Sequence, residues 1–108
     1  MSKGLKKKAA PKKVVTAASS PYCVQWGTPN VMTDTHRYST IGNAKKAIFK
    51  EIAALVAWCE RHNTEGLPEL ERLRGEIDMA TFVSERRRVE CLFDETYGMR
   101  WAVEWWKE

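Results

Sequence analysis

Several features by which proteins reveal their class are missing from this sequence of 108 residues. No apolar run approaches the roughly 18 residues that a membrane span needs. The six glycines stand singly, which excludes a glycine-rich phosphate loop. Neither a G-x-S-x-G segment nor a cysteine or serine in another recognisable catalytic context occurs. The sequence therefore predicts a protein that is not an enzyme, has no catalytic residues and needs no cofactor.

Cysteine and histidine are scarce, with three and two residues. An odd, scattered set of cysteines cannot form a closed disulfide framework, and without a transport signal it predicts a cytoplasmic protein with reduced thiols. Cys59 and His62 have a Cys-x-x-His spacing, and Cys23, Cys91 and His36 would have to supply the other metal ligands. Because no second short-spaced pair exists, we predict no metal site. We interpret the cysteines as buried apolar residues and His62 as a cap at a helix end.

Acidic residues are absent from the first 20 positions, which carry a charge of +6. Of the 18 lysines and arginines, six lie there, which leaves 12 against 14 acidic residues and a charge of −2 for the rest. The six are Lys3, Lys6, Lys7, Lys8, Lys12 and Lys13. The segment has no aromatic residue and little apolar content, so it cannot offset the entropy of ordering. We predict a disordered basic arm over residues 1–20 and a single domain over residues 21–108.

The arm lacks the long apolar stretch of a secretory signal and the arginine-rich, amphipathic pattern of a mitochondrial presequence. Lysine-rich arms bind phosphate groups without sequence preference, so the arm predicts association with DNA or RNA. The sequence does not distinguish between these two nucleic acids. The other interpretation of the arm is a solubilising tail that contacts nothing specific.

The first half of the domain predicts a hairpin followed by a helix. Apolar residues alternate with small or polar ones over residues 22–26, as in a half-buried strand, and residues 36–41 form a second short strand. The clearest element is a helix from about residue 43 to 62, whose apolar residues recur at steps of three and four. Thr40 or Asn43 caps its start.

The second half begins with a shorter helix, which Pro68 opens in a favourable first position. Residues 79–84 fit a third helical turn or a loop packed on the core. Residues 89–93 and 99–106 alternate as the two strands of a hairpin, and Gly98 supplies a positive φ in its turn. A helix over residues 79–93 is the second interpretation of that segment.

Two strands, two helices and two strands predict an α+β fold, in which a small antiparallel sheet of order ββααββ has its helices on one face. Trp105 and Trp106 are neighbours on the last strand, so they point to opposite faces of the sheet. We expect Trp105 in the core and Trp106 exposed. Because exposed tryptophan is typical of a protein interface, Trp106 is the candidate centre of one.

Two basic groups inside the domain are candidate nucleic-acid contacts besides the arm: Lys45, Lys46, Lys50, Arg86, Arg87 and Arg88. The three lysines lie at the helix end where the dipole disfavours them, which indicates a role other than helix stability. The arginines are flanked by Glu85 and Glu90, so the favoured interpretation is a solvated strand edge that its neighbours neutralise.

Residues Tyr38 to Ala47, a strand that turns into a helix, resemble segments of small phage-encoded proteins. The resemblance implies a small accessory or host-directed binding protein. Our first hypothesis is a non-enzymatic binding protein that associates with nucleic acid through its basic arm, without sequence preference. The alternative is a protein–protein interaction module, such as a phage-type accessory protein or an inhibitor of a host protein, with Trp106 in the interface.

Overall fold

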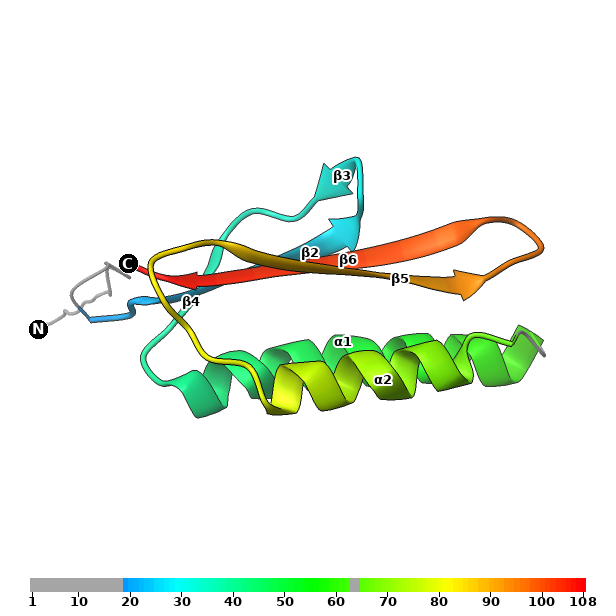
Figure 1. Ribbon diagram of the computed structural model, residues 1–108, viewed down its shortest axis with the longest axis horizontal. Coiled ribbons are helices and arrows are strands. Elements are labelled where there is room, and N and C mark those ends of the chain that lie inside the picture. The colour runs from blue at the N-terminus through cyan, green and yellow to red at the C-terminus, as the bar shows by residue number, and fades with distance from the viewer. Residues whose placement is uncertain (1–18, 63–64) are drawn as a thin grey trace, which may run out of the picture.

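The structure, a computed structural model, describes residues 19–62 and 65–108. Residues 1–18 of the predicted arm lie outside the described residues, so the predicted disorder of the arm stays a prediction. The elements in chain order are β2 (Tyr22–Thr28), β3 (Val31–Met32), β4 (His36–Tyr38), α1 (Ile41–His62), α2 (Leu67–Asp78), β5 (Arg87–Asp94) and β6 (Met99–Lys107). Five antiparallel strands form one sheet, and the two helices lie side by side against one face (Figure 1). The predicted α+β class is confirmed.

The two central strands of the sheet are β2 and β6. The order is β3-β2-β6-β5, and β4 also pairs with β2. Cross-strand pairs join Val24 to Trp105, Tyr22 to Tyr38 and Cys91 to Trp101. Both predicted hairpins are therefore present, and the interpretation of residues 79–93 as a helix is wrong. Gly98 has a φ of 62° in the β5–β6 turn, as predicted.

One strand, β3, lies between the two strands that the sequence predicts and was not itself predicted. It follows a two-residue turn over residues 29–30. In β2, its partner Gly27 has a φ of 148°, and a Cβ added there would lie 2.4 Å from the Val31 carbonyl oxygen. Thr33 then closes the loop, because its N–H donates to the Trp26 carbonyl (2.7 Å) and its hydroxyl accepts from the Trp26 N–H (3.2 Å). Only glycine allows this close return of the chain onto β2.

The helices form where the periodicity predicts them. The start of α1 lies two residues earlier than predicted, and of the two candidate caps it is Thr40 whose hydroxyl accepts the Asn43 N–H (3.0 Å). At the other end, the His62 Nδ1 hydrogen-bonds the Trp58 carbonyl oxygen (2.9 Å), in the predicted capping role. Pro68 lies in the first turn of α2, as predicted.

The core lies between the sheet and the helices. Its buried side chains come from every layer: Val24, Ala44, Ile48, Ile52, Cys59, Leu70, Leu73, Ile77, Phe82, Cys91, Phe93, Trp101, Val103 and Trp105. Residues 79–86 form no helical turn and run along β6, where the Val83 carbonyl accepts the Lys107 N–H (2.7 Å). Phe82 is buried there, whereas Met79 is 81% exposed. Of the two interpretations of this segment, the loop packed on the core is therefore correct.

Candidate functional site

The six lysines of the predicted arm lie outside the described residues, but the place where the arm joins the domain is described. The Pro21 carbonyl accepts the Glu108 N–H (2.9 Å), and Tyr22 pairs with Tyr38 of β4. Because β4 is followed directly by α1, the chain enters the domain beside the first turns of that helix (Figure 1). Any contact made by the arm therefore starts at this end of the molecule.

Lys45 has a structural partner. Its Nζ donates to the Asp78 carbonyl oxygen (2.7 Å), at the last residue of α2. Since carbonyl groups at a helix C-terminus are unpaired and carry partial negative charge, a lysine is favourable there. The dipole of α1 disfavours a lysine at position 45, but the C-terminus of α2 favours it. The sequence of α1 alone does not show this contact.

Lys46 and Lys50 lie on exposed positions of α1 and form no ion pair with the described residues. They border a shallow, wide hollow of about 640 Å³, whose apolar lining exceeds its polar lining. The lining residues are Tyr38, Asn43, Lys46, Ala47, Phe49 and Lys50. Residues 43, 46, 47 and 50 share one helical stripe, since they are separated by three or four positions.

The aromatic wall of the hollow is neutral. Tyr38 and Phe49 are partly buried and pack against the core. Burial, with a smaller contribution from Glu51, raises the pKa of the Tyr38 phenol above its ordinary value. The hydroxyl therefore keeps its proton at neutral pH, so the hollow combines two uncharged rings with two cations.

Arg86 and Arg88 lie elsewhere, on the face of the sheet that the helices leave open. Arg88 Nη1 is 2.5 Å from Glu104 Oε2 and Arg88 Nη2 is 2.9 Å from Glu90 Oε2, while Arg86 Nη1 is 3.4 Å from Glu104 Oε1. Of the two flanking acids, Glu90 pairs with Arg88, whereas Glu85 forms no ion pair with the described residues, and Glu104 of β6 supplies the other carboxylate. Arg87 alternates away from its two neighbours and is exposed.

Trp106 points away from the helices, as predicted, but the expected exposure is wrong. Its side chain is 5% exposed because the Arg86 guanidinium lies 3.8 Å from the ring centroid. The indole Nε1 donates to Glu108 Oε2 (3.3 Å). The pairing register of β5 and β6 explains this contact. Arg87 pairs with Trp105, so Arg86 comes opposite Trp106.

The three cysteines are buried and free, which confirms their interpretation as core residues. Burial raises the pKa of the Cys91 thiol to about 11. Cys59 Sγ donates to the Phe93 carbonyl (3.5 Å), and Cys23 Sγ accepts from Arg37 Nη1 (3.3 Å). Within residues 19–62 and 65–108, no three histidine, cysteine or acidic side chains gather as metal ligands would.

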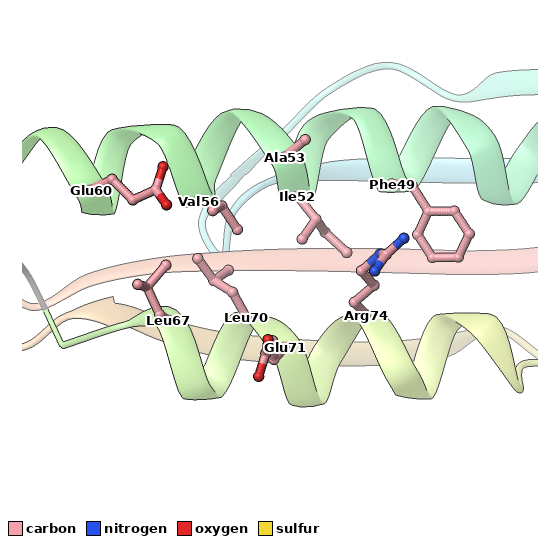
Figure 2. A pocket seen from close by; sticks show the side chains of 9 residues that line it. All are labelled: Phe49, Ile52, Ala53, Val56, Glu60, Leu67, Leu70, Glu71 and Arg74. Atoms are coloured by element: carbon pink, nitrogen blue, oxygen red, sulfur yellow. The ribbon is translucent and has the colours of Figure 1, made fainter.

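A second concave surface, which the sequence did not reveal, lies between α1 and α2 on their outer side (Figure 2). This groove has a volume of about 410 Å³, and side chains from both helices point into it. Its lining consists of Phe49, Ile52, Ala53, Val56, Glu60, Leu67, Leu70, Glu71 and Arg74. The Arg74 guanidinium lies 5.4 Å from the centroid of the Phe49 ring, which covers one end of the apolar strip.

The described helices include none that is long and apolar enough to cross a membrane. In comparisons with known proteins, no family model, no curated protein and no solved structure matches this chain.

Proposed function

We propose that this protein is a small non-enzymatic binding protein that associates with nucleic acid through its basic N-terminal arm. The observation that carries the proposal is the separation of charge between arm and domain. The domain engages many of its own cations: Arg37 pairs with Glu108, Arg72 with Glu69 and Glu76, and Arg86 and Arg88 with Glu104. The arm has six lysines and no acidic residue that could neutralise them.

The mechanism is neutralisation of backbone phosphates with release of their counterions. Lysines on an arm that the sequence predicts to be disordered cannot read base edges with fixed geometry, so we expect binding to tolerate any sequence. Arg86 and Arg88, which belong to an ion-pair network on the open face, contribute little to this binding. Lys46 and Lys50 stand near the root of the arm and extend its positive charge onto α1.

The proposal is tested with a full-length variant in which the six arm lysines are replaced by glutamine. Binding of a fluorescent duplex is measured by anisotropy at several salt concentrations. The wild-type protein should show a slope of log affinity against log salt no steeper than about −5, since each neutralised phosphate contributes about −0.9. The variant should lose most of the affinity and most of the slope.

A matched control removes charge from the domain and leaves the arm intact. Arg86→Gln with Arg88→Gln should leave the affinity within about twofold, because these groups are already paired. Duplexes of different sequence and equal length should bind equally well. Salt-insensitive binding, or equal loss in the arm and control variants, contradicts the proposal.

A second candidate function, the protein interaction module, is favoured by the groove between α1 and α2. This function does not depend on Trp106, because the apolar lining of the groove is itself open to solvent, with Leu67 36% exposed. Glu60 and Glu71 are exposed at its rim, so the complementary occupant is a peptide segment with apolar side chains and at least one basic residue.

Selection of displayed random peptides on the immobilised full chain tests this second function. Enriched peptides should combine spaced apolar residues with lysine or arginine, and Ala53→Glu in the groove should abolish their binding. Glu85→Gln, an exposed change in the loop before β5, should leave it intact. Selection without such enrichment, or peptides that bind the Ala53 variant equally, removes this candidate.

A further inference from the structure

We propose that the hollow lined by Tyr38, Asn43, Lys46 and Lys50 is a subsite for single-stranded nucleic acid, where an unstacked base meets an aromatic wall and the lysines hold its phosphates. The inference rests on the proposed function of the arm and adds a preference for single strands. It is carried by the joint placement of rings, cations and an amide in one depression of about 640 Å³.

The chemistry of the lining matches that of a nucleotide. Tyr38 and Phe49 line the hollow with half-buried rings, and Arg74 already lies over the Phe49 ring. The Tyr38 ring is therefore the surface proposed for stacking, which any base can use because every base has a π-face. Lys46 and Lys50 lie one helical turn apart on the exposed side of α1, which suits phosphates of one strand. Asn43 adds an amide that can both donate and accept hydrogen bonds at a base edge.

The arm and the hollow are adjacent through the sheet. Tyr22, at the root of the arm, pairs with Tyr38, which is part of the hollow itself. A strand bound in the hollow therefore lies close to the point where the arm joins the domain, so one ligand can contact both. Two linked sites raise the local concentration of ligand at each other, so their joint affinity exceeds that of either alone.

The arrangement favours single strands over a duplex. In a duplex, the bases are stacked inside and present only their edges, so they cannot lie on the rings of a shallow hollow. In a single strand, an unstacked base can turn outward onto an aromatic side chain while the backbone stays near the lysines. The arm alone favours the duplex slightly, because the counterion release per phosphate is larger on a duplex than on a single strand.

The first test compares Tyr38→Leu with Tyr38→Phe in the full-length protein. Affinities are measured by anisotropy for oligo(dT) and oligo(U) of about 20 nucleotides and for a duplex of equal length. Tyr38→Leu should bind both single strands about tenfold more weakly and leave duplex binding within twofold. Tyr38→Phe keeps the ring and should bind as the wild type does. The two oligonucleotides show whether DNA or RNA is preferred.

The second test uses surface lysines, so that it does not depend on a partly buried residue. Lys46→Gln with Lys50→Gln should reduce the salt slope for oligo(dT) by about 1.4, since each phosphate on a single strand contributes about −0.7. The charge-matched control is Arg61→Gln with Arg100→Gln, in the last turn of α1 and near the start of β6, both exposed. The end of α1 and the β5–β6 turn lie at the opposite end of the molecule from the start of β2 (Figure 1). The control should keep the slope and the affinity.

The outcomes separate this inference from the proposed function. If Tyr38→Leu and the lysine pair change nothing in single-strand binding while the arm variant still loses it, the subsite is overturned and the arm function stands. If no nucleic acid binds the wild-type protein at low ionic strength, both fail. Equal loss of duplex and single-strand binding in Tyr38→Leu also overturns the subsite, because stacking would then not be the cause.

Discussion

On one face of the sheet, Trp101 and Trp105 lie among aliphatic side chains that two helices supply; on the other, Trp106 lies beneath the guanidinium of Arg86. The exposed fractions of Trp105 and Trp106 are nearly equal, at 6% and 5%. The groups that cover the two rings differ. The helices over Trp105 are held by their own core contacts, whereas the Arg86 side chain over Trp106 is held by an ion pair to Glu104 and by its contact with the ring. Equal burial therefore does not imply equal packing or equal stability.

The largest effect is expected on the helix-covered face. Trp105→Ala should lower the free energy of unfolding by about 3–5 kcal/mol, because it leaves a cavity in the core. It also removes the hydrogen bond from Trp105 Nε1 to the Thr81 carbonyl (3.1 Å). Urea denaturation followed by circular dichroism measures this loss. A loss below about 1 kcal/mol would show that the helices do not form a rigid cover.

The cysteines sharpen the comparison, since Cys91 lies in the helix-covered core and Cys23 pairs with Trp106 on β6. Burial raises the pKa of both thiols, but the nearby Arg37 and Arg86 partly lower that of Cys23. In the folded protein at pH 8.5, iodoacetamide should modify Cys23 at least about tenfold faster than Cys91. Peptide mass mapping over time gives both rates, and equal rates would contradict the difference between the two covers.

Trp106→Ala should cost about 2 kcal/mol, less than Trp105→Ala. The arginine that covers the ring has a flexible stem and can settle into the vacated space, which limits the remaining cavity. The same urea series measures the difference. As a control, Lys50→Ala should change stability by only a few tenths of a kcal/mol, as an exposed site does. A cost for Trp106→Ala equal to that of Trp105→Ala would show that the two covers are equally rigid.

Acid should have the smallest effect, and only at the edge of the open face. Hydrogen bonds from Arg37 and then from Trp106 hold the pKa of Glu108 below its ordinary value. A carboxylate with a lowered pKa in the folded state stabilises it above about pH 4.3, and this contribution is lost as the pH falls through the folded-state pKa.

Thermal unfolding of Glu108→Gln against the wild type measures this contribution. At pH 7, the variant should melt a degree or two lower, and this difference should shrink as the pH falls through the folded-state pKa of Glu108. Because the pair is exposed, the difference should also shrink in high salt. A difference that persists unchanged in acid would mean that the carboxylate charge is not its cause.

Periodicity in the sequence was enough to predict most of the fold. The stripe of Ile48, Ile52 and Cys59 reflects burial of one side of α1, which local spacing records directly. Alternation over residues 22–26 and 99–106 located β2 and β6, although both faces of these strands carry buried side chains. Strand β3 was missed because two residues, Val31 and Met32, are too few to show a period. Its formation depends instead on the backbone conformation of Gly27.

The candidate sites were harder to predict, because they depend on contacts between distant segments. In the sequence, Lys45 lies at the helix end where the dipole disfavours a cation; in the structure, it binds the Asp78 carbonyl of α2. Trp106 was assigned to the surface because the sequence does not show that Arg86 folds over it. The groove on the outer side of α1 and α2 arises only when both helices are side by side. Residue spacing along one element contains none of this information.

The position of β6 at the centre of the sheet has a consequence for synthesis of the protein on the ribosome. β6 pairs with both β2 and β5, so residues 22–28 find their main partner only after residue 107 has been made. Until then, the half of the core that Trp101, Val103 and Trp105 supply is missing, and the helices have no complete surface to cover. Folding of this domain therefore waits for the synthesis of β6, and until then the nascent chain exposes apolar helix stripes.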